Sequence, residues 1–228
     1  MSNENATSVD PFAVTDCALI ALATGERAQN LRELRDRLMR NHDADIIYYH
    51  FWGGLLRPHF VDPEYQNHFA GWAYHDLHDR TLAERLAIIN PADFDDMNDL
   101  QNAVIDVVEA RMDEDPLAPA MEAEHPFFFM RSQIVVFGTR LRIDDPAQLA
   151  GIIARLSIGS LFYHFIDARR RTPSRRDDFS EWLTAKGRQY DPLVDALASV
   201  DPYFNSLLGL REQIAAIFAA HLDRRNRP

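Results

Sequence analysis

Cysteine and lysine are almost absent from this 228-residue chain, which contains one of each, Cys17 and Lys186. A single cysteine excludes a disulfide within the chain and excludes zinc or iron–sulfur sites built from several cysteines. Any metal would therefore have to be held by histidine and carboxylate side chains. Because a disulfide framework is missing, a reducing compartment is favoured, and we expect a cytoplasmic protein.

The chain also lacks the short motifs of several large enzyme classes. It has no phosphate-binding loop ending in Gly-Lys-Ser or Gly-Lys-Thr, no glycine-rich dinucleotide fingerprint, no paired-histidine zinc motif and no serine nucleophile elbow. Lysine chemistry would have to depend on Lys186 alone. With no recognised catalytic motif, a non-catalytic protein is favoured and no cofactor is expected.

Long apolar runs and an excess of positive charge are missing as well. The longest apolar run spans residues 17–23, far short of the roughly 18 residues that cross a bilayer. The net charge of −11 opposes general binding to nucleic acids, which requires clustered positive charge. Residues 1–11 are predicted to form a disordered tail without a targeting segment, and residues 223–228 a C-terminal tail. We therefore expect neither a membrane nor a nucleic acid as partner.

The chain contains enough apolar side chains for a core, and their pattern repeats. Hydrophobic residues make up 46% of the sequence and aromatic residues 11%. The repeated blocks are Tyr48-Tyr49-His50-Phe51 with Phe162-Tyr163-His164-Phe165, Phe69-x-x-Trp72 with Phe179-x-x-Trp182, Asn90-Pro91 with Asp201-Pro202, and the helical stripe of Leu100, Val104, Val108 and Met112 with that of Leu210, Ile214, Phe218 and Leu222. Four blocks in the same order predict two tandem homologous helical repeats related by a pseudo-twofold, residues 12–112 and 127–222. The proline-rich, acidic residues 113–126 are interpreted as the linker.

Within each repeat the pattern predicts a mainly α fold, that is α+β with a few short strands. The opening segments are ambiguous, because residues 127–137 are rich in strand formers whereas residues 18–23 would suit a helix. If the repeats are homologous both openings should be strands, and we predict strands. Four helices should follow in each repeat. Their start signals are Asn30, Ser160, Thr81, Asp145 with Pro146, and Asp191 with Pro192.

At these residues the chain resembles an uncharacterised bacterial family, one of the catalogued domains of unknown function. The resemblance covers nearly the whole chain and rests on duplicated Tyr-His-Phe and Asp-Phe-x-x-Trp blocks. The matching segments are Thr24-Gly25-x-x-Ala28-x-x-Leu31-x-Glu33-Leu34, Tyr48-Tyr49-His50, Asn67-His68-Phe69-x-x-Trp72 and Asp178-Phe179-x-x-Trp182. His68 departs from the pattern, because the family has an acidic residue there. The resemblance implies an architecture and no activity.

His50 and His164 are the main candidate site residues, because each lies between aromatic residues at matching places in the two repeats. One interpretation is that both are buried and hydrogen-bonded structural histidines. The other is that the pseudo-twofold brings them to one cleft that binds a small anion. The candidate ligand-binding residues are then Tyr49, His50, Arg57, Tyr163, His164 and Arg169.

A metal site is a weaker alternative. His75 and His78 are neighbours on a predicted helix and, with His50 and His59, could hold a divalent metal. A solvated polar face explains the same spacing. Trp72 and Trp182 are predicted to be buried core residues.

The sequence therefore leaves two classes of function open. The first is a non-catalytic binding protein, built from an internal duplication, that acts through a protein partner or self-association. The second is a small-molecule binding protein or enzyme with a His, Tyr and Arg site between the repeats. Fold analogy does not choose between them.

Overall fold

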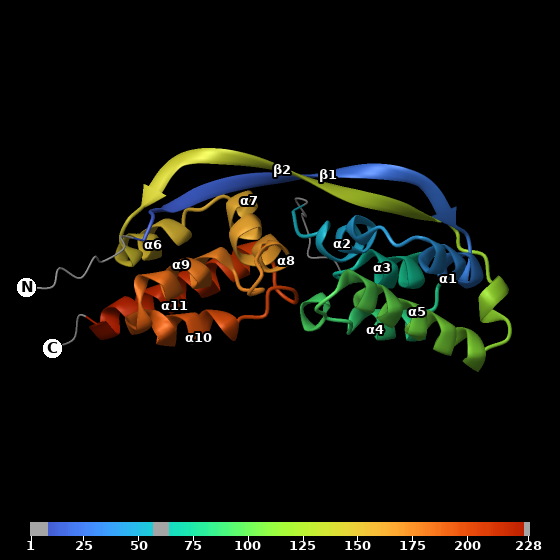
Figure 1. Ribbon diagram of the computed structural model, residues 1–228. Coiled ribbons are helices and arrows are strands. Elements are labelled where there is room, and N and C mark those ends of the chain that lie inside the picture. Colours follow the sequence, from blue (N-terminus) through green and yellow to red (C-terminus); the bar gives the residue numbers. More distant parts are fainter. Residues whose placement is uncertain (1–8, 57–63, 226–228) are drawn as a thin grey trace, which may run out of the picture. The chain divides into compact units, whose positions relative to one another are not determined.

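The structure is a computed structural model that describes residues 9–56 and 64–225. The chain divides into two compact units, of which unit 1 is Met1–Ala18 with Val136–Pro228 and unit 2 is Leu19–Val135. More than half of the residues are helical, and two long strands make the fold α+β (Figure 1). Most of the predicted N-terminal tail and the last three residues lie outside the described residues.

The two predicted strands are confirmed, but they are not short. β1 (Phe12–Ala28) and β2 (Phe127–Ile143) contain 17 residues each and form a two-stranded antiparallel sheet. The Thr139 hydroxyl donates to the Val14 carbonyl in unit 1, and the Thr24 hydroxyl donates to the Phe129 carbonyl in unit 2. The residue numbers of both pairs add up to the same total, as one continuous antiparallel register requires. Each strand thus contributes one segment to each unit.

Unit 2 contains the helices that follow β1, and they lie on one side of its strand segments (Figure 1). The helices are α1 (Leu31–Arg40), α2 (Ala44–Trp52), α3 (His68–His75), α4 (Arg80–Ala87), η1 (Pro91–Asp93), α5 (Met97–Glu114) and η2 (Ala118–Ala120). The predicted linker is therefore partly helical. Ala118 and Ala123 are buried, and the Gln29 side chain donates to the Ala123 carbonyl at 2.6 Å, so this segment packs on unit 2.

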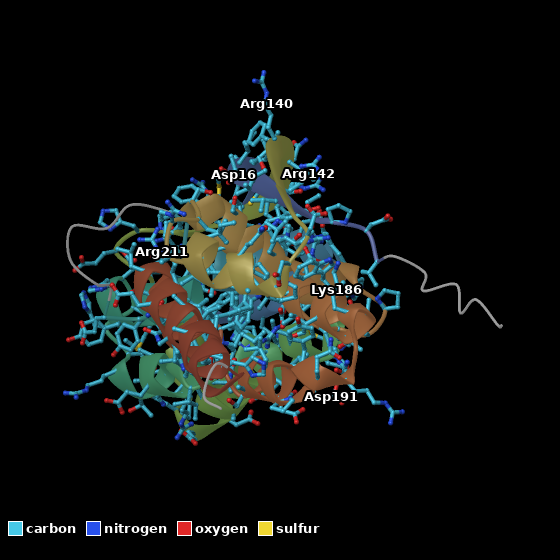
Figure 2. The ribbon with its side chains drawn as sticks, turned by 90° about the vertical axis from the view of Figure 1, so that its left-hand side faces the viewer. Asp16, Arg140, Arg142, Lys186, Asp191 and Arg211 are labelled. Atoms are coloured by element: carbon cyan, nitrogen blue, oxygen red, sulfur yellow. The ribbon has the colours of Figure 1, made fainter. Side chains whose placement is uncertain are left out.

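Unit 1 contains the helices that follow β2. They are α6 (Pro146–Ile153), α7 (Ile158–Leu161), the π-helical η3 (Phe162–Asp167), α8 (Ala168–Arg171), α9 (Asp178–Lys186), η4 (Arg188–Tyr190), α10 (Asp191–Ala198) and α11 (Leu207–Arg225). α11 continues past the predicted end of the second repeat at residue 222. At the end of β2, Arg140 extends away from the helices into solvent (Figure 2). Such exposed charges are typical of uncovered strands.

Helix starts were partly predictable from capping residues. Asn30 and Asp145 do cap α1 and α6. Ser160 is not a cap; the Ser157 hydroxyl accepts from the Ser160 N–H instead. The start at Thr81 is also wrong, because the carboxylate of Asp79 accepts from the Leu82 N–H and α4 begins one residue earlier than predicted.

The core of each unit combines helices that follow one strand with the opening segment of the other strand. In unit 2, Phe127 of β2 stacks on Phe69 at 4.9 Å between ring centroids and meets Trp72 edge-on. In unit 1, Phe12 of β1 stacks on Phe179 at 5.2 Å and meets Trp182 in the same way. Each unit is therefore completed by residues far away in the sequence.

Both tryptophans are buried, as predicted, and both anchor the chain just before a strand. Trp72 Nε1 donates to the His125 carbonyl and Trp182 Nε1 donates to the Asp10 carbonyl, each at 2.9 Å. A buried indole N–H needs such an acceptor. These two bonds fix where each strand begins relative to its helices.

Phe127 and Phe128 provide a direct test of this packing, because they are adjacent on one strand and are 4% and 57% exposed. Phe127→Ala should lower the free energy of unfolding by about 3 to 5 kcal/mol, since it leaves a cavity among Phe69, Trp72 and His50. Phe128→Ala should change it by about 0.5 kcal/mol or less. Chemical denaturation of both variants measures the difference, and equal losses would contradict the strand placement.

Candidate functional site

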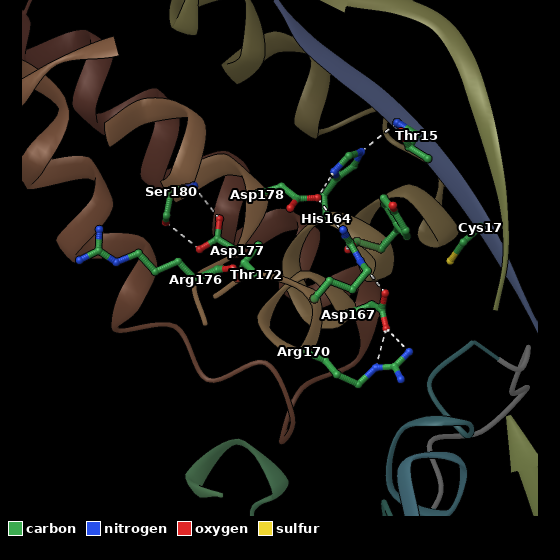
Figure 3. Close-up of polar contacts among 12 residues, drawn as sticks. Thr15, Cys17, His164, Asp167, Arg170, Thr172, Arg176, Asp177, Asp178 and Ser180 are labelled. Atoms are coloured by element: carbon green, nitrogen blue, oxygen red, sulfur yellow. Dashed lines mark hydrogen bonds and ion pairs between the residues drawn. The ribbon is translucent and has the colours of Figure 1, made fainter. Parts of the chain in front are cut away.

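His164 is the centre of a hydrogen-bonded network in unit 1 (Figure 3). The backbone N–H of Thr15 donates to His164 Nε2 at 2.8 Å, and His164 Nδ1 lies 2.7 Å from Asp178 Oδ2. A backbone N–H can only donate, so Nε2 must be unprotonated and the ring proton must be on Nδ1. His164 is 3% exposed, and both of its nitrogens are used within the unit.

Arg171 extends this network. Its guanidinium donates to Asp178 Oδ2 at 3.0 Å and to Asp167 Oδ2 at 2.8 Å, and it lies over the Tyr163 ring at 3.8 Å from the centroid. Asp167 is buried and also pairs with Arg170 (Figure 3). Two arginines, Arg170 and Arg171, therefore compensate the buried carboxylate.

His50 occupies the matching position in α2 of unit 2. The Met130 N–H donates to His50 Nε2 at 3.2 Å, and His50 Nδ1 lies 3.2 Å from His68 Nδ1. The same reasoning places the His50 proton on Nδ1, so His68 Nδ1 accepts it and the His68 ring is neutral. A histidine in unit 2 thus replaces the aspartate of unit 1.

A pocket of about 540 Å³ opens beside His50 and His68 in unit 2. Its described lining is rich in aromatic side chains and includes two carboxylates. The residues that define its chemistry are Tyr49, Tyr65, Trp72, Phe128, Glu64 and Asp76. This volume lies in the range of roughly 300 to 1,000 Å³ that holds small ligands.

A second pocket, of about 430 Å³, opens beside His164 in unit 1. Its lining includes Tyr163, Trp182 and the pair of Arg171 and Asp178. Both pockets therefore contain a tyrosine, a histidine and a tryptophan from corresponding helices. They differ in charge, because only the described lining of the unit 1 pocket includes an arginine.

The structure places each predicted site residue within its own unit. Tyr49 and His50 line the pocket of unit 2, whereas Tyr163 and His164 line the pocket of unit 1. Arg169 lies elsewhere, with its guanidinium over the Phe165 ring at 4.9 Å. Arg57 and His59 are outside the described residues. A cleft shared by both histidines stays a prediction.

Of the predicted metal ligands that the structure describes, His50 and His75 line the same pocket and His78 does not. His75 lines the unit 2 pocket, and His78 pairs with Glu124 at 2.8 Å. Within residues 9–56 and 64–225, no three histidine, cysteine or carboxylate side chains come together as a metal site would require. A site that includes His59 lies outside this range.

The charges of Asp177 and Arg169 interact near the start of α9. Burial raises the pKa of the Asp177 carboxyl above its ordinary value of 3.8, although hydrogen bonds from Ser180 and the charge of Arg169 act in the opposite direction. Burial likewise lowers the pKa of Arg169. Asp177 caps α9 through the Ser180 N–H, and Asn67 caps α3 in unit 2 through the Ala70 N–H. An uncharged amide therefore performs the same capping role in unit 2.

Arg171 and Asp178 were not predicted from the sequence as members of the His164 network. The repeat itself contained the signal, because Arg171 follows His164 by the same spacing as Arg57 follows His50, whereas Arg169 does not. Similarly, Asp178 precedes Phe179 as His68 precedes Phe69. Thr15 and Met130 could not be found, since they contribute backbone groups that carry no signal in the sequence.

Comparisons with known proteins support the architecture. The model of a family described as "Family of unknown function (DUF5752)" matches residues 9–219. The chain is also similar to "The structure of OrfY from Thermoproteus tenax", with 27% sequence identity and a TM-score of 0.79, over 94% of this chain and 96% of that one. No curated protein matches significantly. In the described part of the chain, no helix has both the length and the hydropathy to cross a membrane.

The tautomer of His164 can be measured directly. Long-range ¹H–¹⁵N NMR spectra of the full chain at neutral pH should show a protonated Nδ1 and an unprotonated Nε2, because the Thr15 N–H occupies Nε2. The spectrum of His164→Gln identifies the signal by its loss. A proton on Nε2 would contradict the network of Figure 3.

Asp177→Asn should stabilise unit 1 near neutral pH, because the amide keeps an oxygen for the Ser180 N–H and does not ionise. The pKa of Asp177 is raised in the folded state, so the folded protein binds the proton of this carboxyl more tightly than the unfolded chain does. The stabilisation from this proton is complete below pH 3.8, the ordinary pKa, and is lost as the pH rises through the folded-state pKa. The advantage of the variant over wild type should therefore grow between about pH 4 and pH 7.

The matched control is Asn67→Asp in unit 2, which introduces an ionisable group at a buried cap. Its free energy of unfolding should fall relative to wild type over the same pH range. Denaturation curves at several pH values test both variants. A stability difference for Asp177→Asn that does not change with pH would show that the Asp177 pKa is not raised.

Proposed function

The chain belongs to the DUF5752 family of unknown function, and from that premise we propose that it is a non-catalytic binding protein whose ligand site is the pocket of unit 2. The observation that carries the proposal is the pocket of about 540 Å³ with aromatic walls beside His50 and His68. Ligand sites combine such apolar walls with a few convergent polar groups. Here Tyr49, Glu64 and Asp76 provide those groups.

We further propose that the two units are duplicated copies that have exchanged strands. Five contacts recur at corresponding positions: the histidine with a strand N–H, the tryptophan with a carbonyl, the stacked phenylalanine pair, the threonine across the sheet, and the helix cap. A sixth follows the same spacing, with Cys17 Sγ donating to the Gly159 carbonyl and Ser132 Oγ to the Asp45 carbonyl. Independent origins would not be expected to reproduce so many contacts in one order.

The histidines are assigned a structural role. The pair of His164 and Asp178 has the spacing of a catalytic acid–base pair, but Nε2, the nitrogen that would face a substrate, accepts from the Thr15 N–H. His50 is held in the same way by the Met130 N–H. Burial raises the pKa of Cys17 to about 12, so this thiol is not a nucleophile at neutral pH.

The pocket of unit 1 is assigned to structure rather than to ligand binding. Arg171 and Asp178 neutralise each other in its wall, and Arg171 also bonds the Tyr163 carbonyl at 2.9 Å. In unit 2 the corresponding place of Asp178 is taken by the neutral ring of His68. The duplication thus leaves one copy to stabilise the fold and the other to bind.

Gly71 allows the proposal to be tested without disturbing the core. This glycine lines the unit 2 pocket, and a Cβ atom added there meets nothing within 4 Å. Gly71→Leu should fill the pocket and also stabilise α3, because leucine favours a helix by about 0.5 to 1 kcal/mol over glycine. Gly151→Leu on α6 is the matched control, since it too meets nothing within 4 Å and lies outside both pocket linings.

A fragment library screened by protein-observed NMR should give binders whose chemical-shift changes map to Trp72 and Gly71. Binding should be lost in Gly71→Leu and kept in Gly151→Leu, with both variants at least as stable as wild type. The proposed site would be refuted by fragments that bind Gly71→Leu as well as wild type, or by a screen that finds no fragment bound at this pocket. A protein that binds only other proteins would give no fragment bound at this pocket.

A further inference from the structure

A cation of the chain itself covers the tryptophan of unit 1. Lys186, the last residue of α9, places its Nζ 5.0 Å from the ring centroid of Trp182 and donates to the Val9 carbonyl at 3.3 Å. This distance lies within the roughly 6 Å over which an ammonium group is attracted to an aromatic face. The only lysine of the chain is therefore used at an aromatic wall beside the unit 1 pocket.

The corresponding position in unit 2 has the opposite charge. Asp76 follows Trp72 by four residues, as Lys186 follows Trp182. Asp76 lines the pocket with a side chain that is 22% exposed, and its Oδ1 lies 2.9 Å from His125 Nδ1. Unit 2 thus keeps the tryptophan and has a carboxylate where unit 1 has an ammonium group.

The rest of the described pocket lining also favours a positive ligand. It contains a second carboxylate, Glu64, and it contains no lysine or arginine. Of the three histidines in the described lining, His50 and His68 are kept neutral by their hydrogen bonds, so these two imidazoles do not offset the carboxylates. Aromatic faces together with carboxylates are the surroundings that organic cations prefer, because ring quadrupoles and negative charge act in the same direction.

We propose that the unit 2 pocket binds an organic cation, that is a primary or quaternary ammonium group attached to an apolar body. The ammonium group lies by Asp76 and Trp72, in the role that Lys186 has in unit 1, and the apolar body lies against the other aromatic walls. The inference rests on the proposed function and adds the chemical class of the ligand. This class differs from the anionic ligand predicted from the sequence, whose arginine in this unit, Arg57, lies outside the described residues.

Probes of equal size and different charge test the class of ligand. Benzylamine and benzyltrimethylammonium should bind the full chain at pH 7 with Kd values about tenfold lower than benzyl alcohol, and benzoate should bind least. Isothermal titration calorimetry measures all four. Raising the salt concentration should weaken binding of the two cations and leave benzyl alcohol unchanged, because salt screens the attraction of the carboxylates.

Two variants of Asp76 locate the effect. Asp76→Asn should raise the Kd of the two cations about tenfold and leave the Kd of benzyl alcohol unchanged. The control is Asp106→Asn, which removes an exposed carboxylate of α5 outside the pocket lining and should change the Kd of neither the cations nor benzyl alcohol. Asp76→Lys should abolish cation binding, because it restores the arrangement of Lys186 over Trp182. If Asp76→Asn proves unstable, the salt dependence of cation binding to the wild-type protein tests whether carboxylates attract the ligand.

The outcomes separate the two proposals. If benzyl alcohol or benzoate binds as tightly as benzylamine, and all binding is lost in Gly71→Leu, the proposal of a cationic ligand is wrong. The pocket then remains the proposed ligand site. Library fragments that bind without dependence on Gly71 would overturn the proposed function. Cation binding that is unaffected by Asp76→Asn would overturn the role of this carboxylate in the pocket.

Discussion

One backbone N–H in each strand, donated to a buried imidazole, is the constraint on which both units depend. Thr15 N–H occupies Nε2 of His164, and Met130 N–H occupies Nε2 of His50. Because a buried N–H needs an acceptor, the tautomer of each histidine is fixed, and so is the need for an acceptor at Nδ1. Asp178 and His68 meet that need from the first residues of α9 and α3, directly after the capping residues Asp177 and Asn67.

The aromatic residues around each histidine turn this hydrogen bond into a packed junction. Phe12 contacts His164, Phe179 and Trp182, and Phe127 contacts the three matching side chains of unit 2. The polar bond sets the register of the strand, since a shift by one residue would replace the inward phenylalanine and remove the N–H from the imidazole. Apolar burial then supplies most of the stabilisation. The hydrogen bond and the apolar packing are therefore both needed to fix one position of each strand on its helices.

Much of this could be predicted from the sequence, because helical stripes and caps are local signals. The burial of Trp72 and Trp182 was predicted from their spacing of three residues after Phe69 and Phe179, and burial of His50 and His164 was one of the two interpretations of their positions between aromatic residues. The packing of each strand's opening segment on helices that follow the other strand could not be predicted, since a period of two residues marks an inward face but does not identify the helices that cover it. The strand length was missed for a related reason. Beyond Cys17 and Ser132 the strands are largely exposed, so their alternation is weak.

The packing of the opening segment of β1 on helices that follow β2 also sets the order in which the chain can fold during synthesis. Unit 2 is continuous, so it can close once Val135 has emerged. The segment of β1 that begins at Phe12 is made early, but its receiving helices in unit 1 are made last. At roughly 5 to 20 residues per second, its apolar face therefore waits roughly 10 to 30 seconds for the helix of Trp182 during synthesis. A newly made chain thus exposes the apolar face of Phe12 and Val14, which the folded protein buries.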